Sequence, residues 1–250
     1  NGLRVVDGYS RIVRLGEGLT HTGRLSDEAM ARAYQALTAC AQRIEARAPV
    51  AVGCVATQAC RSASNGQIFL NRIRTDLGLD FEIISSEEEA QLAVLGCASL
   101  IEPEPEVTLI VDIGGGSTEL SWVRPKDVLA NPLEAPILAW GTAPLGVVTL
   151  AEEEEEPAAG KQAWYEALVE RLAVQIASVG DAAHLRAAFE QGRAHVIGTS
   201  GTVTSLAGVH LGLSRYQRAR VDGYWFDVGA CRQTIAQMLA KTLEQRAANP

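Results

Sequence analysis

Two carboxylates bracket a glycine turn near the middle of the chain, which reads Val-Asp-Ile-Gly-Gly-Gly-Ser-Thr-Glu over residues 111–119. Apolar residues flank this segment, so we expect the turn to join two strands, unlike the Walker and Rossmann loops, which open into helices. Glycines allow backbone N–H groups to approach an oxyanion closely. The residues of the turn that we expect to bind phosphate are Gly114, Gly115, Gly116 and Ser117.

Asp112 and Glu119, at the two ends of this segment, suit a divalent cation. A carboxylate at the end of a buried strand is costly to ionise without a compensating charge. Mg²⁺ supplies such a charge, and its sites often use only one or two carboxylates, with water and substrate phosphate as the remaining ligands. We therefore expect Asp112 and Glu119 to bind Mg²⁺. The alternative is a glycine hairpin that only turns tightly.

Three further segments carry residue types that bind phosphate or act on water. Gly201 and Thr202 lie in a predicted strand-to-helix turn that could receive a second phosphate, although an ordinary capped helix explains the pattern equally well. Arg61 follows a predicted strand, at the end where α/β sheets bind ligands; the alternative is a surface arginine. Glu89 is one of three acids in a predicted first helical turn, and helix capping alone gives no reason to prefer it.

The elements around these residues alternate between strand and helix patterns, which predicts an α/β class with mixed sheets. The apolar run at residues 50–56 predicts a strand covered on both faces. The spacing of Phe69, Ile73 and Leu77 predicts a helix that ends at Gly78. The pair Pro103 and Pro105 predicts a hinge, with one lobe at residues 1–104 and a second lobe, which carries the glycine turn, at residues 105–250.

Other patterns fill the remaining parts of the chain. Short strands are predicted at Leu3–Val6 and Ser10–Leu15, joined by a turn at Asp7-Gly8. Ser26 and Asp227 are expected to cap helices. The five glutamates at residues 152–156 predict a solvated loop or a frayed helix start. The helix that follows is predicted to bury one side, formed by Trp164, Leu168, Leu172 and Ile176.

The composition limits the function classes. A net charge of −8 in 250 residues argues against a general nucleic-acid or anionic-membrane surface, and no apolar stretch is long enough to span a membrane. Nearly all cations are arginines, which grip phosphate oxygens in pairs, although a preference for arginine codons would give the same bias. The five cysteines form no CxxC pair and indicate a reducing compartment. We therefore expect a cytoplasmic location.

Taken together, the motifs resemble those of the exopolyphosphatase/guanosine pentaphosphate phosphohydrolase family, in the order of that family. They span about residues 10 to 210 and are specific as a set. The matching segments are Arg14–Gly18, Ala56–Asn65, Ile83–Ala90, Asp112–Leu120 and Gly198–Thr202.

The resemblance implies a two-lobe actin-like (ribonuclease H-like) fold with mixed sheets flanked by helices and a cleft between the lobes. It implies Mg²⁺-assisted release of a terminal phosphate from inorganic polyphosphate or guanosine pentaphosphate, and it favours a homodimer. Glu89 looks like the base that activates water, and Asp112 and Glu119 look like the Mg²⁺-associated acids. The glycine turn and Arg61 would hold the phosphate.

The sequence departs from the family pattern in three respects. The first phosphate loop on the N-terminal strand is absent, and so is a Gly-Leu-Arg-Glu-Gly stretch near the C-terminus, so we expect the chain to be shortened at both ends. Ser86 stands where a glycine is usual. Two alternatives stay open: a regulator that binds polyphosphate or alarmone with weak catalysis, and an ATP-dependent kinase or ATPase of the same superfamily.

Overall fold

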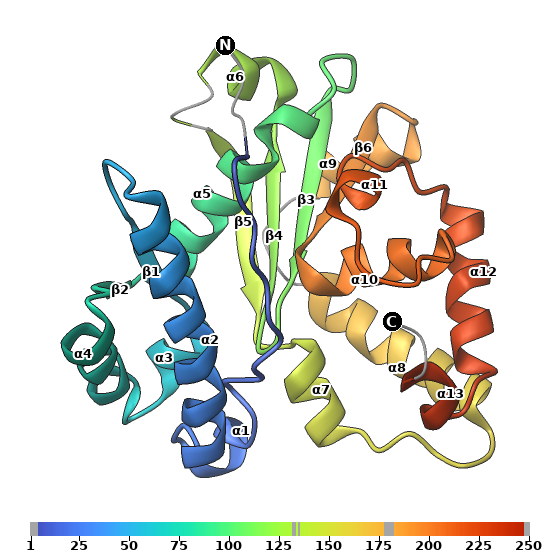
Figure 1. Cartoon of the computed structure of the whole chain (residues 1–250). Helices are drawn as coiled ribbons and strands as arrows, with labels where there is room; N and C mark the ends of the chain where they lie inside the picture. The colour runs from blue at the N-terminus through green and yellow to red at the C-terminus, as the bar shows by residue number, and fades with distance from the viewer. Residues whose placement is uncertain (1–4, 132–133, 135, 178–182, 248–250) are drawn as a thin grey trace. The chain divides into compact units, whose positions relative to one another are not determined.

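The chain divides into two compact units, residues 1–86 and 87–250. The computed structural model describes residues 5–131, 134, 136–177 and 183–247 (Figure 1). The division falls directly after Ser86, the first residue of helix α5 (Ser86–Cys97), whereas the proline pair at 103 and 105 indicated a boundary after this helix. The reason is that Val94 and Cys97 of α5 are buried in the core of the second unit.

The first unit packs helices around a two-stranded parallel sheet, in which Cys54 lies opposite Phe81. Its long helix begins where Ser26 Oγ accepts a hydrogen bond from the Ala29 N–H at 3.1 Å, as the capping pattern predicts. The elements are α1 (Leu19–Thr22), α2 (Asp27–Arg47), β1 (Cys54–Ala56), α3 (Gln58–Ser62), α4 (Gly66–Leu77) and β2 (Phe81–Ile83).

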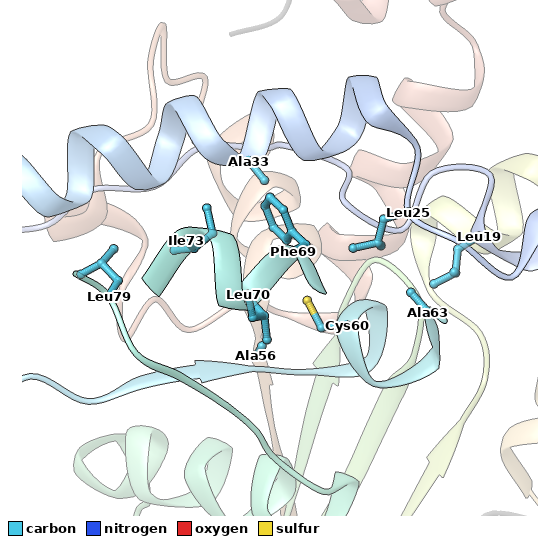
Figure 2. Close-up of a cluster of buried hydrophobic side chains, with 10 residues drawn as sticks. All are labelled: Leu19, Leu25, Ala33, Ala56, Cys60, Ala63, Phe69, Leu70, Ile73 and Leu79. Carbon is cyan, nitrogen blue, oxygen red and sulfur yellow. The ribbon is translucent and has the colours of Figure 1, made fainter. Parts of the chain in front are cut away.

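The core of the first unit is formed by the apolar side of α4. Phe69, Leu70 and Ile73 are buried and meet side chains of α2 and α3, among them Ala33 and Cys60 (Figure 2). Gly78 ends α4 in the left-handed conformation, with φ 69°. The helix predicted from the spacing of the apolar residues is confirmed.

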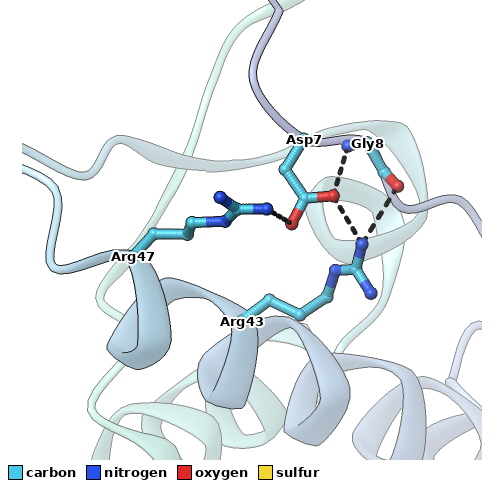
Figure 3. Close-up of polar contacts among 4 residues, drawn as sticks. All are labelled: Asp7, Gly8, Arg43 and Arg47. Atoms are coloured by element: carbon cyan, nitrogen blue, oxygen red, sulfur yellow. Dashed lines mark hydrogen bonds and ion pairs between the residues drawn. The ribbon is translucent and has the colours of Figure 1, made fainter.

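The predicted N-terminal hairpin is wrong within the described residues, because residues 5–14 form no strand. Asp7 instead accepts hydrogen bonds from two arginines of α2, at 2.5 Å from Arg43 and 3.5 Å from Arg47 (Figure 3). The hydrogen bond from Arg43 is the largest cause of the lowered pKa of the Asp7 carboxyl, followed by the one from the Gly8 N–H, and the charge of Arg47 contributes least. Side-chain hydrogen bonds thus hold this segment to α2, whereas a hairpin would need backbone hydrogen bonds between two strands.

The predicted strand at residues 50–56 is shorter and more exposed than expected. Only Cys54–Ala56 pairs in the sheet, Val50 is fully exposed, and Val55 is 45% exposed. The sheet of this unit has two strands, so a residue of β1 is not covered on both faces as it would be inside a wide parallel sheet.

The second unit is built on a four-stranded sheet in the order β5-β4-β3-β6 (Figure 1). Its strands are β3 (Val107–Ile113), β4 (Thr118–Val123), β5 (Ile137–Ala143) and β6 (Ala194–Thr199). Strand β3 is antiparallel to β4 and parallel to β6. The mixed α/β class is therefore confirmed.

Helices lie before, between and after these strands along the chain. After α5 comes a short 3-10 helix, η1 (Ala98–Leu100). The remaining helices are α6 (Pro125–Ala130), α7 (Val147–Glu153), α8 (Lys161–Ala177), α9 (Ala183–Glu190), α10 (Ser200–His210), α11 (Arg218–Val221), α12 (Val228–Leu239) and α13 (Leu243–Ala247).

Both faces of the sheet carry apolar side chains. On one face, Ile110, Val123 and Ile197 form a core with α5 and with Val128 of α6. On the other face, Trp122 packs edge-on against Phe189 of α9, with ring centroids 5.4 Å apart. A cavity of about 750 Å³ occupies the rest of this second face, between the strands and α7, α8 and α9.

The predicted apolar side of α8 is only half-buried. Leu172 and Ile176 face this cavity, and Trp164 and Leu168 are half-buried as well.

The run of five glutamates begins inside α7: Glu152 and Glu153 are the last two residues of this helix, and the other three follow it. Glu156 is not solvated as expected, because its carboxylate pairs with Lys161 at 2.7 Å and also with Arg246.

The cysteines are free thiols, as their spacing indicated. Among the residues that the structure describes, no helix combines the length and apolar character needed to cross a membrane.

Two isoleucines of α4 provide a test of the first unit's core. Ile73 is fully buried, whereas Ile68 is 70% exposed. Ile73→Ala should lower the free energy of unfolding by about 2–5 kcal/mol, because it leaves a cavity. Ile68→Ala should change it by less than about 0.5 kcal/mol. Equilibrium urea unfolding followed by circular dichroism measures both; equal losses would contradict this packing.

Candidate active site

The register of the four-stranded sheet places four polar residues in one row. Asp112 of β3 lies directly opposite Glu119 of β4 and opposite Thr199 of β6. Glu119 lies opposite Thr142 of β5. Directly paired residues project from the same face of a sheet, so the two carboxylates are neighbours, with a threonine on either side.

Hydroxyl groups around the row donate to both carboxylates. Thr142 Oγ1 donates to Glu119 Oε1 at 3.1 Å, and the Ser117 hydroxyl donates to the same carboxylate. The Ser200 hydroxyl donates to Asp112. Thr142, Thr199 and Ser200 were not predicted as site residues from the sequence. Strand pairing places Thr142 and Thr199 beside the acids, and Ser200 follows Thr199 at the start of α10.

Burial raises the pKa of both acids. Glu119 is only 3% exposed, and desolvation is the largest cause of its raised pKa, followed by smaller contributions from the charges of Glu89 and Asp112. Desolvation is likewise the main cause of the raised pKa of Asp112. No cationic side chain is among the causes for either group. The pair therefore fits a divalent cation, which would supply the missing positive charge.

The described residues include no group of three or more His, Cys, Asp or Glu side chains that could hold a metal ion. An ion at Asp112 and Glu119 would therefore need oxygen atoms from water and substrate to complete its coordination. Mg²⁺ commonly binds in this way, through one or two carboxylates.

The glycine turn between β3 and β4 is fixed by its own backbone and by the start of α7. The Gly114 N–H donates to the Ser117 carbonyl at 2.9 Å. The Gly114 and Gly115 carbonyls accept from the N–H groups of Val147 and Val148, at 3.1 and 2.8 Å. Within the described residues, the N–H groups of Gly115, Gly116 and Ser117 have no hydrogen-bond acceptor, so they can bind an anion.

Close contact between this turn and α7 requires a glycine at position 146. A Cβ atom at Gly146 would lie 2.3 Å from the carbonyl of Gly115, which is closer than side chains ever approach a backbone. Gly146 was missed at the sequence level, where it looks like an ordinary residue before a helix.

The turn from β6 into α10 lies at the same end of the sheet. Thr202 Oγ1 donates to the Ile113 carbonyl at 3.1 Å, so its hydroxyl ties α10 to the end of β3. A Cβ atom at Gly201 would meet only open space. Ser200, which contacts Asp112, has φ 72°, a left-handed conformation that is unfavourable for serine. The assignment of Gly201 and Thr202 to phosphate stays a prediction.

Glu89 belongs to the same region of the second unit. It is half-buried in the first turn of α5, and its charge contributes to the raised pKa of Glu119. Helix α5 packs on the sheet face that carries Asp112, since Val94 and Cys97 meet Ile110 there. The structure thus brings Glu89, from an earlier segment of the chain, close enough to Glu119 for its charge to act on that carboxyl.

Arg61 lies in the first unit and makes contacts there. Its Nη1 donates to the Ile84 carbonyl at 2.6 Å, and its Nη2 donates to Ser86 Oγ at 2.9 Å. The positions of the two units relative to each other are not determined, so the predicted role of Arg61 in binding phosphate stays a prediction.

The second unit is thus a mixed α/β unit with paired buried acids beside a glycine turn. A model of the Ppx/GppA phosphatase family matches residues 1–247, and the chain belongs to this family. Ppx/GppA proteins belong to the actin-like ATPase superfamily, which agrees with the expected fold. The expected cleft between the lobes stays a prediction.

Solved structures give the same result. An exopolyphosphatase-like protein is 30% identical, with a TM-score of 0.78, over 96% of this chain and 72% of that protein. A Ppx/GppA family member from Aquifex aeolicus is 25% identical, with a TM-score of 0.66, over 95% and 71% of the two chains. An exopolyphosphatase from Cytophaga hutchinsonii, 23% identical, shares the fold with a TM-score of 0.72, over 94% and 72%.

Gly146→Ala tests the support of the glycine turn. The added methyl group must displace the Gly115 backbone, and a shift of this size at a phosphate site should lower the rate of phosphate release by about 10- to 100-fold. Gly208→Ala in α10 is the matched control, since nothing lies within 4 Å of a Cβ atom there. Equal activity of both variants would contradict the proposed contact.

The raised pKa values predict how stability depends on pH. A carboxyl with a raised folded-state pKa contributes fully to stability below its unfolded pKa of about 4, and this contribution is lost as pH rises through the folded pKa. Without added divalent cations, Asp112→Asn and Glu119→Gln should therefore lose less stability between pH 4 and 7 than the wild type. Urea unfolding across this range measures the difference, and parallel curves would contradict the assigned burial.

Proposed function

We propose that this protein is a Mg²⁺-dependent phosphohydrolase that releases terminal orthophosphate from inorganic polyphosphate, guanosine pentaphosphate or both. The observation that carries the proposal is the pairing of Asp112 with Glu119 beside a glycine turn whose N–H groups are available to an anion. Membership of the Ppx/GppA phosphatase family supports the same reaction class.

Asp112 and Glu119 would hold Mg²⁺ in this proposal. When bound, the ion would neutralise charge on the phosphate oxygens and contribute to their orientation. The hydroxyl donors Ser117, Thr142 and Ser200 keep both carboxylates oriented. Supporting donors of this kind fix the direction in which metal ligands point.

The glycine turn would hold the terminal phosphate. The N–H groups of Gly115, Gly116 and Ser117 would donate to its oxygen atoms. Because α7 holds the Gly114 and Gly115 carbonyls, the turn is already ordered before an anion binds. Preorganised donors stabilise developing charge without rearranging during the reaction.

Glu89 would orient and activate the attacking water. A new bond forms between the water oxygen and the terminal phosphorus, and the bond from phosphorus to the bridging oxygen breaks. The bridging oxygen leaves with a product one phosphate shorter. Phosphoryl transfer depends mainly on positioning and charge neutralisation, so an aligned carboxylate can suffice.

Both proposed substrates end in the same chemical group, a phosphoanhydride with a terminal phosphate. The residues gathered around Asp112 act on that group and do not distinguish the remainder of the molecule. Both substrates therefore belong in one assay, with Mg²⁺ and with a chelator.

A matched pair of glutamates in the first turn of α5 tests the role of Glu89. Glu89→Gln should lower kcat by about 100-fold or more, the usual scale of general acid–base catalysis. Glu87→Gln, at an exposed position of the same turn, should keep wild-type kcat. Orthophosphate release from polyphosphate and from guanosine pentaphosphate measures both variants.

Two results would contradict the proposal. Unchanged kcat in Glu89→Gln would remove Glu89 from the reaction. An active wild type that is indifferent to chelator would exclude the Mg²⁺ role of Asp112 and Glu119. Tight binding of guanosine pentaphosphate without phosphate release would instead favour a regulator.

A further inference from the structure

Ser86, the first residue of α5 and the last residue of the first unit, is held by a side chain from helix α3 of that unit. The guanidinium of Arg61 donates from Nη1 to the Ile84 carbonyl at 2.6 Å and from Nη2 to Ser86 Oγ at 2.9 Å. Ile84 directly follows β2, and Ser86 is the first residue of α5. One rigid fork therefore holds both sides of the short connection between strand and helix.

Arg61 is itself well anchored for this task. It lies in α3, where its backbone N–H donates to the Thr57 carbonyl at 3.0 Å. The neighbouring Cys60 is only 4% exposed and belongs to the core of the first unit. The Ile84 N–H also donates to the Ala56 carbonyl at 3.0 Å, at the end of β1. Both ends of the connection are thus fixed. The Ala56 carbonyl of β1 and the Arg61 guanidinium hold Ile84, and the same guanidinium holds Ser86.

We propose that Ser86 is a positioning residue: by holding the Arg61 guanidinium, its hydroxyl fixes the first turn of α5 and with it Glu89. The inference rests on the proposed function, because Glu89 acts on water only in that reaction. Ser86 does not touch the reacting atoms. Its effect reaches them through one helical turn, and small misplacements of a reacting group lower rates strongly.

Kinetics of three variants at position 86 and of one control test the proposal. Ser86→Ala and Ser86→Gly should lower kcat for phosphate release by about 10-fold with little change in KM. Ser86→Thr keeps the hydroxyl and should restore most of the rate. Ser62→Ala, at an exposed serine next to Arg61 in α3, is the control and should behave as wild type.

A double mutant shows whether Ser86 acts through Arg61. Arg61→Ala already removes the donor, so Ser86→Ala should cause no further loss in that background. Independent losses that multiply would overturn the proposal, because Ser86 would then act without the arginine. Wild-type kcat in Ser86→Ala would overturn it as well.

Hydrogen exchange provides a readout that does not depend on activity. In Ser86→Ala, amides of residues 86–94 should exchange several-fold faster than in wild type, with Ser86→Thr close to wild type. Unchanged exchange in Ser86→Ala would overturn the anchoring role. A wild-type protein that releases no phosphate would overturn the proposed function instead, while exchange would still decide whether Ser86 fixes the helix start.

Discussion

Two carboxylates placed side by side in a poorly hydrated row are the constraint on which the site depends. Asp112 and Glu119 face each other across an antiparallel pair, and burial raises the pKa of both. Like charges at this separation repel, and hydroxyl donors relieve only part of the cost. A divalent cation would offset the two negative charges, and it could also bind a phosphate oxygen.

The backbone around the row explains why the acids end up there. Strand β3 runs through the core, where Ile110 is packed by α5, and it delivers Asp112 two residues later on the same face. The glycine turn returns the chain so that Glu119 lies opposite. Helix α7 then holds the turn through the Gly114 and Gly115 carbonyls, which requires the absence of a side chain at Gly146. Packing, turn and acid pair thus depend on one another.

Much of this could be predicted from residue types that act locally. The glycines between Asp112 and Glu119, the spacing that defines α4, and the caps at Ser26 and Asp227 each leave a signal within a few residues. Features that depend on distant partners could not. Thr142 and Thr199 join the site only through strand register, and Gly146 only through contact with Gly115.

The wrong predictions have the same origin. Residues 5–14 have a hairpin pattern, but Asp7 is held by arginines of α2 instead. The run at residues 50–56 has the composition of a covered strand but lies in a sheet of two strands. Glu156 lies in a polar run that suggests solvent, yet it pairs with the nearby Lys161 and with Arg246, which is distant in the sequence.

The central claim, that Asp112 and Glu119 form a metal and phosphate site, can be tested directly by crystallography. Crystals grown with Mn²⁺, in place of Mg²⁺, and orthophosphate should show an anomalous peak about 2.1 Å from a carboxylate oxygen of Asp112 or Glu119. Phosphate should lie against the N–H groups of Gly115 and Gly116. Bound phosphate elsewhere, with no metal peak at these carboxylates, would contradict the account.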